Sequence, residues 1–124
     1  MAQKTVLVVE DDPHQRDIVV TFLRHHGYAV LEAADGAAGV DAASSHRPDL
    51  VIMDARLPVL DGWAATQRIK SSPEVCTIPV VLLTAAALEE DRERSTRAGC
   101  DAYLAKPCDP HTVLREVRQW IGAP

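Results

Sequence analysis

Short, almost purely apolar runs alternate along the chain with longer segments in which apolar residues recur every three or four positions. A run of about five apolar residues between turn-forming residues is typical of a buried strand, and the longer periodic segments are typical of helices. The pattern predicts strands at residues 5–9, 29–33, 50–53, 79–84 and 102–105. It predicts helices from Pro13 to a glycine cap at Gly27, and at 36–45, 63–69, 88–98 and 110–121.

This strict alternation predicts an α/β fold with a parallel sheet, because parallel neighbouring strands need a crossover and the crossover helices cover both faces. Right-handed crossovers leave few topologies. A flavodoxin-like (βα)5 doubly wound sheet with strand order 2-1-3-4-5 is the most economical of them. The chain has 124 residues and contains no linker, repeat or low-complexity segment, so a single domain over 1–124 is expected.

The segment at 88–98 departs from the pattern of its neighbours. Its sequence EEDRERSTR has almost no apolar stripe, so little hydrophobic burial is available to hold it on the sheet. Its order is expected to rest on pairs such as Glu90–Arg94 and Glu93–Arg97, spaced one helical turn apart. We therefore predict that this helix is the least anchored element.

The net charge and the composition narrow the range of functions that this chain can have. The formal net charge is −5 and no basic run is present, which argues against direct nucleic-acid binding. No apolar run is long enough to span a membrane, and the N-terminal sequence lacks the apolar stretch of a signal peptide. The three cysteines have no metal-site spacing. A cytoplasmic protein is expected.

Acidic residues follow two of the predicted strands. Glu10 and Asp11 end the first strand and Asp54 ends the third, and these strands are neighbours in the 2-1-3-4-5 order. A single aspartate at a strand end serves as a turn cap about as often as it has a chemical role. Three carboxylates at one sheet edge repel one another and need a neutralising partner. Mg²⁺ suits this role, because it takes one or two carboxylates together with waters and phosphate oxygens.

Two further polar residues belong to the same edge of the sheet. Thr84 ends the fourth strand and Lys106 ends the fifth. A carboxylate nucleophile, a metal site, a fixed cation and a hydroxyl donor together are the groups that phosphoryl transfer requires. The five residues therefore predict a phosphoryl-transfer site built around Asp54.

Four segments carrying these residues resemble one known family. VLVVEDD, LVIMDARLPVLDG, VVLLTA and AYLAKP are similar to the strand-end motifs of the receiver domains of two-component response regulators. The resemblance covers essentially the whole chain, and the intervals between Asp54, Thr84 and Lys106 fit the family. It implies a signalling switch of the single-domain, chemotaxis-regulator type rather than an enzyme, one that catalyses only its own phosphorylation and dephosphorylation.

The resemblance also implies a phosphoryl donor and a metal. Asp54 would accept a phosphoryl group from a sensor histidine kinase or a histidine phosphotransfer protein. Mg²⁺ would be held by Asp11, Asp54 and the main-chain carbonyl of Arg56, with Glu10 contacting it through water. Glu10 stands where many members of the family have aspartate, which lengthens the reach to metal-bound water.

Further roles follow from the same resemblance. Lys106 would pair with phosphoryl oxygens, Thr84 would donate a hydrogen bond to one of them, and the main-chain N–H of Ala85 would join it. Tyr103 would turn inward as Thr84 moves, the alternative being a half-buried strand aromatic with no switching role. The bond from Lys106 to Pro107 is expected to be cis, which is a minority state for proline in general.

Two positions are expected to set the lifetime of the phosphoryl group. Arg56 and Ala86 lie two residues after Asp54 and Thr84, where the family tunes that lifetime. Arg56 would either screen Asp54 from attacking water or lie in solvent, and the sequence leaves both open. The signal is expected to leave through the surface of the helix at 88–98, the strand at 102–105 and the helix at 110–121, and to reach a downstream protein or effector domain.

Three alternatives compete with this interpretation. A haloacid-dehalogenase-type phosphatase also uses an aspartyl phosphate and Mg²⁺, but it wants a second aspartate where Arg56 stands. An interaction module independent of phosphorylation would typically lose one of the acids, the hydroxyl or the lysine. The last predicted helix runs almost to Pro124, which favours a stand-alone regulator, although a receiver excised from a longer protein would look identical.

Overall fold

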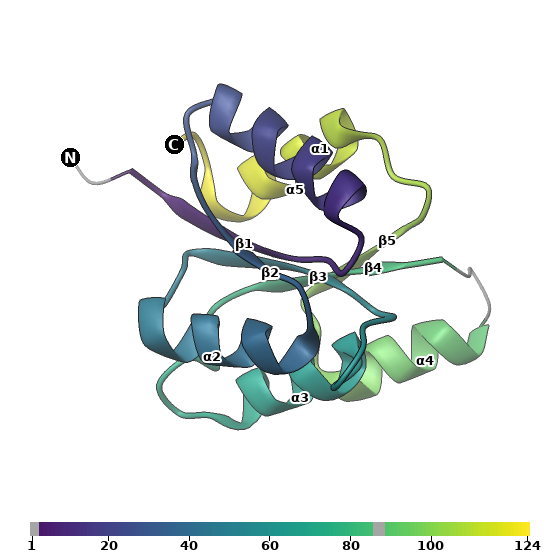
Figure 1. Cartoon of the computed structure of the whole chain (residues 1–124). Coiled ribbons are helices and arrows are strands. Elements are labelled where there is room, and N and C mark those ends of the chain that lie inside the picture. The colour runs from purple at the N-terminus through teal and green to yellow at the C-terminus, as the bar shows by residue number, and fades with distance from the viewer. Residues whose placement is uncertain (1–2, 86–88) are drawn as a thin grey trace.

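The strands form one parallel sheet with the predicted topology. The computed structural model describes residues 3–85 and 89–124. Its strand order is β2-β1-β3-β4-β5, and every neighbouring pair is parallel, which confirms the predicted fold class (Figure 1). The strands are β1 Thr5–Val9, β2 Ala29–Ala33, β3 Leu50–Asp54, β4 Val80–Thr84 and β5 Ala102–Ala105.

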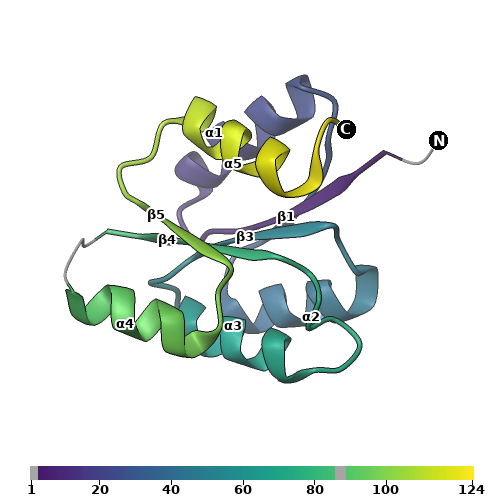
Figure 2. The same cartoon turned by 180° about the vertical axis from the view of Figure 1, so that it is seen from behind.

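Helices cover both faces of this sheet. They are α1 Pro13–His25, α2 Gly36–His46, α3 Gly62–Ser71, α4 Glu89–Ala98 and α5 Pro110–Ile121. α1 and α5 lie on one face, and α2, α3 and α4 lie on the other (Figures 1 and 2). The predicted start of the fourth helix, Leu88, falls outside the described residues.

Aspartates begin four of the helices. The side chains of Asp12, Asp35, Asp61 and Asp109 each accept a hydrogen bond from a main-chain N–H in the first turn of α1, α2, α3 and α5. This cap satisfies donors that have no partner inside the helix. Because these helices begin after the loops at the carboxyl edge of the sheet, the caps fix where those loops end.

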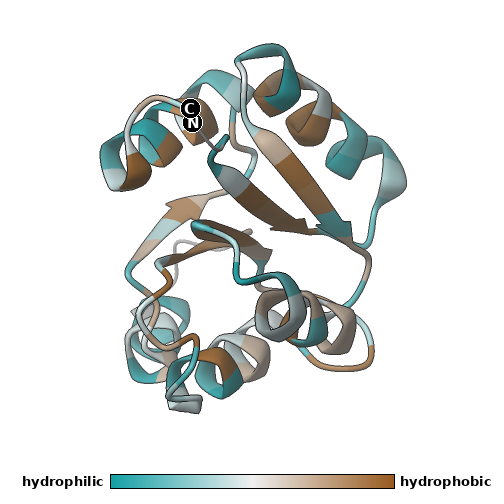
Figure 3. Cartoon of the chain, turned by 90° about the vertical axis from the view of Figure 1, so that its left-hand side faces the viewer, coloured by the Kyte–Doolittle hydropathy of each residue, from teal (hydrophilic) through white to brown (hydrophobic). Residues whose placement is uncertain are grey.

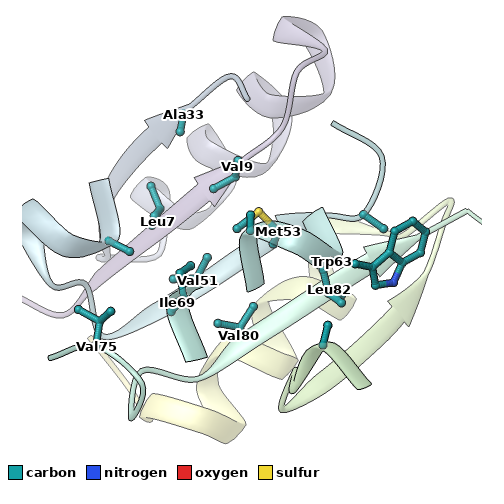
Figure 4. Close-up of a cluster of buried hydrophobic side chains, with 14 residues drawn as sticks. Leu7, Val9, Ala33, Val51, Met53, Trp63, Ile69, Val75, Val80 and Leu82 are labelled. Atoms are coloured by element: carbon teal, nitrogen blue, oxygen red, sulfur yellow. The ribbon is translucent and has the colours of Figure 1, made fainter. Parts of the chain in front are cut away.

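The core lies in two layers, one on each face of the sheet. Along β1, Val6 and Val8 pack toward α1 and α5, whereas Leu7 and Val9 pack toward α2 and α3. Figure 3 shows largely apolar strands between helices that carry both polar and apolar residues, and Figure 4 shows the layer under α2 and α3. Burial on both faces explains why the strand sequences are continuously apolar.

The ion pairs predicted to order α4 are wrong. Neither Glu90–Arg94 nor Glu93–Arg97 is among the ion pairs of residues 3–85 and 89–124. Instead, Arg94 pairs with Asp61, the N-cap residue of α3, at 3.6 Å between Nη2 and Oδ2. Ser95 is fully buried against α3. The helix is thus held by polar contacts with its neighbour, which the search for a pattern within one helix cannot detect.

Candidate functional site

Three carboxylates meet at the carboxyl edge of the sheet. Glu10 and Asp11 follow β1 and Asp54 ends β3, and β1 and β3 are hydrogen-bonded neighbours. One carboxylate oxygen from each residue lies within 4.8 Å of the other two, a spacing at which the three could hold a metal ion. Glu10 and Asp54 are buried and Asp11 is exposed, so the cluster opens to solvent on one side.

A single ammonium group bridges two of the three acids. Nζ of Lys106 lies 2.9 Å from Oε1 of Glu10 and 3.1 Å from Oδ2 of Asp54. The side-chain amide oxygen of Gln15 accepts a longer hydrogen bond from the same nitrogen, at 3.4 Å. Gln15 was not predicted from the sequence. Its position in the first helical turn after Glu10 and Asp11 could have indicated it.

Local backbone contacts position the lysine. The bond between Lys106 and Pro107 is cis, as predicted, and the main-chain N–H of Lys106 donates to the carbonyl of Thr84 at 2.8 Å. The β5 strand therefore stays paired with β4 up to the residue that carries the ammonium group. Nη1 of Arg16 donates to the main-chain carbonyl of Glu10 and so fixes the residue that follows β1.

The cluster perturbs two of its own charges. Partial desolvation by the neighbouring residues raises the pKa of Asp11, and a hydrogen bond and the negative charge of Glu10 raise it further. Burial disfavours the charged form of Lys106, but the hydrogen bonds and charges of Glu10 and Asp54 outweigh this and raise the pKa of Lys106. The lysine is therefore a permanent cation at neutral pH, and the acids keep excess negative charge that a metal ion would offset.

Two further predicted residues, Thr84 and Tyr103, lie on β4 and β5. Thr84 is the last residue of β4 and is buried, with Ala105 opposite it on β5. Ala85 follows at the surface, and Ala86 lies outside the described residues. Tyr103, on β5, has 41% of its surface exposed, so its side chain is turned outward in this structure.

The loop after Asp54 packs unusually tightly against α3. Arg56 is exposed, and its main-chain N–H donates to Oδ1 of Asp54 at 3.3 Å. Gly62 begins α3 with its N–H on the carbonyl of Ala55. A Cβ atom on Gly62 would lie 2.0 Å from the carbonyl oxygen of Asp54. Only glycine allows this close approach, so the start of α3 lies directly against the main chain of Asp54.

Comparison with known proteins identifies the family. The family model for the response regulator receiver domain matches residues 6–118. The chain is a response regulator receiver domain.

Individual proteins similar to this receiver domain are themselves response regulators or receiver domains. It is 33% identical over 119 residues to the polar-differentiation response regulator DivK of Brucella anthropi, covering 96% of this chain and 97% of DivK. It is 41% identical to the receiver domain of the sensor histidine kinase PA1611 of Pseudomonas aeruginosa, with a TM-score of 0.89 over 98% of this chain and 100% of the other. That crystal structure has a magnesium ion in its active-site cleft. The Vibrio cholerae chemotaxis protein CheY4 is 28% identical, with a TM-score of 0.90 over 97% of this chain and 100% of CheY4.

A groove opens beside the acidic cluster of this receiver domain. It has a volume of about 680 Å³ and runs between α1 and the start of α5. Glu10 and Lys106 line it together with Ile18, Val113 and other apolar side chains. Ile18 is 43% exposed, which is high for a residue of its size and polarity.

The three cysteines, Cys76, Cys100 and Cys108, are free thiols of intermediate burial. None of the helices in residues 3–85 and 89–124 combines the length and apolar character needed to cross a lipid bilayer.

Proposed function

We propose that this receiver domain is a phosphorylation-dependent switch in which Asp54 accepts a phosphoryl group from a phosphohistidine. The donor would be a sensor histidine kinase or a histidine phosphotransfer protein, and the setting the cytoplasm. The observation that carries the proposal is the Lys106 ammonium group, which lies within 3.1 Å of Oδ2 of Asp54 while two more carboxylates adjoin. A cation fixed beside a carboxylate nucleophile and a carboxylate cluster is the arrangement that phosphoryl transfer needs.

The donor set fits Mg²⁺, because it consists of carboxylate oxygens with one side open to solvent. Asp11, Asp54 and the main-chain carbonyl of Arg56 would hold the ion, and Glu10 would contact it through water. When bound, Mg²⁺ would neutralise part of the negative charge on the phosphoryl group that is transferred.

The chain's own residues carry the transfer. An oxygen of Asp54 attacks phosphorus, the bond from phosphorus to the histidine nitrogen breaks, and its electron pair stays on the imidazole. Lys106 then pairs with the phosphoryl oxygens. The Thr84 hydroxyl and the Ala85 N–H donate hydrogen bonds to them, and Tyr103 turns inward as Thr84 moves. Hydrolysis of the aspartyl phosphate resets the switch, and Arg56 and Ala86 set its rate.

Incubation with acetyl phosphate and Mg²⁺ tests this function directly. Intact-protein mass spectrometry should show one added phosphoryl mass, and chelation of the metal by EDTA should prevent it. Steady turnover of small phosphate esters would instead favour the phosphatase alternative, which is disfavoured because Arg56 occupies the position of its acid/base aspartate. No added mass at any acetyl phosphate concentration would reject the proposal.

Mg²⁺ should stabilise the fold, since it offsets the repulsion among Glu10, Asp11 and Asp54. A ligand that binds only the native state adds about 2.7 kcal/mol at 100 times its dissociation constant. Thermal unfolding monitored by circular dichroism at rising MgCl₂ should show a melting temperature that is constant well below the dissociation constant and rises steadily with log concentration above it. NaCl at matched ionic strength is the control. Equal shifts with both salts would contradict a specific metal site.

The groove beside Asp54 suits a protein donor, because an apolar surface next to the nucleophile can dock the donor's histidine-bearing segment. Ile18→Asp should slow transfer from a phosphorylated donor about tenfold, which corresponds to the loss of one good interface contact. Uptake from acetyl phosphate should be unchanged. Thr21→Asp, which adds the same charge at an exposed position of α1 outside the groove, is the matched control. Equal rates for both variants with the protein donor would contradict the docking role.

The output surface should be formed by α4, β5 and α5, which lie along one side of the domain (Figure 2). Tyr103 and Trp120 are exposed there by 41% and 39%. Hydrogen exchange with and without beryllofluoride, a stable substitute for the phosphoryl group, should show altered protection across β5 and α4. A change confined to residues that touch Asp54 would reject this surface as the output.

A further inference from the structure

Trp63 fastens α4 to α3 through a buried hydrogen bond. Its indole is 4% exposed and its Nε1 donates to Oγ of Ser95 at 3.0 Å. Ser95 is itself fully buried, and its hydroxyl donates to the main-chain carbonyl of Asp91 at 2.8 Å. Figure 4 places Trp63 at one end of the apolar layer, beyond Met53 and Leu82. The position of α4 therefore depends on how this one ring is seated.

Two arginines from different elements lie against the same ring. The guanidinium carbon of Arg94, on α4, is 4.2 Å from the ring centroid, and its Nη2 pairs with Asp61. The guanidinium carbon of Arg56 is 5.6 Å from the centroid. Both distances are within the range of cation–π attraction. Asp61 in turn caps α3 through the N–H of Ala64, at 2.8 Å.

Arg56 connects this cluster to the phosphoacceptor. It lies two residues after Asp54, and its main-chain N–H donates to the Asp54 carboxylate. Its side chain is exposed and has room to move, whereas the indole that it contacts is enclosed. A new charge at Asp54 therefore arises two residues from a side chain whose guanidinium group lies against the ring that contacts α4.

We propose that Trp63 is a coupling residue: the phosphoryl group on Asp54 competes with the indole for the Arg56 guanidinium, and the ring passes the change to α4 through Ser95 and Arg94. The inference rests on the proposed function of Asp54. A phosphoryl group adds a charge of about −1.5 to −2, which attracts a nearby guanidinium more strongly than a ring face does. This route is separate from Thr84 and Tyr103, because it passes through α3.

Fluorescence of Trp63 tests the first step. The chain has two tryptophans, so Trp120→Phe leaves Trp63 as the sole indole emitter. In that background, saturating Mg²⁺ and beryllofluoride should shift the emission of Trp63 relative to Mg²⁺ alone. Arg56→Ala should abolish this shift, and Arg68→Ala, which removes an exposed arginine from α3, should preserve it. Fluorine NMR measures beryllofluoride occupancy in each variant, so a binding defect is seen separately.

Hydrogen exchange tests the second step. Trp63→Phe keeps a ring but removes the donor to Ser95, and it should reduce the beryllofluoride-dependent change in protection of α4. Trp120→Phe should leave that change intact. Absence of beryllofluoride binding in the unmodified protein would overturn the proposed function itself. Binding accompanied by an unshifted Trp63 emission, or by an unaltered α4 response in Trp63→Phe, would overturn the coupling role alone.

Discussion

Asp54→Asn should take up no phosphoryl group from acetyl phosphate under conditions that fully modify the unchanged protein. The amide has no anionic oxygen to attack phosphorus, and it supplies a weaker partner for the ammonium group of Lys106, which lies 3.1 Å from the carboxylate. The measurement is intact-protein mass after incubation with acetyl phosphate and Mg²⁺. The expected result is complete loss of the added mass.

Two controls make this loss interpretable. Asp41→Asn removes a carboxylate from an exposed position on α2 and should be modified like the unchanged protein. Without metal, Asp54→Asn should melt at a higher temperature than the unchanged protein, because one of three mutually repelling acids is gone, and its response to Mg²⁺ should be weaker. Full modification of the Asp54→Asn variant would show that another residue accepts the phosphoryl group.

Gly62→Ala should destabilise the fold by about 3 kcal/mol, the upper part of the range for overpacking a tight contact. The added Cβ would lie 2.0 Å from the carbonyl oxygen of Asp54 and 2.7 Å from Cα of Ala55. Both are main-chain atoms, so no side-chain rotation relieves the clash. Chemical unfolding in urea measures the change. Because the displaced atoms belong to the phosphoacceptor itself, uptake from acetyl phosphate should slow as well.

Gly99→Ala is the matched control for this substitution. Gly99 has φ +89°, and a Cβ there would lie 3.4 Å from its nearest atom, Cγ of Lys70, which is an ordinary contact. The only cost of alanine at this position is therefore the left-handed backbone conformation. That conformation costs about 1–2 kcal/mol, and the change is remote from Asp54, so phosphoryl uptake should stay normal. Equal losses of stability in the two variants would contradict the steric explanation for Gly62.

The sequence by itself predicted the sheet, its strand order and the five residues of the candidate site. The apolar runs are continuous because the strands are buried on both faces, and most of the helices are marked by apolar periodicity. Once the order 2-1-3-4-5 is inferred, the carboxyl ends of β1 and β3 must meet, which brings Glu10 and Asp11 to Asp54. These features follow from neighbours in the chain and from rules of connection.

Only the tertiary structure showed how α4 is held and what else touches the site. Trp63 and Ser95 are 32 residues apart, and Gln15 and Lys106 are 91 apart. Such contacts depend on the angle and register at which two packed elements cross, and no local pattern of polar and apolar residues encodes these. The charge pattern of α4 predicted pairs within the helix, but Arg94 instead lies over Trp63 and pairs with Asp61. A buried ring offers that guanidinium a fixed partner, whereas a glutamate on the same exposed helix stays solvated and gains little by pairing.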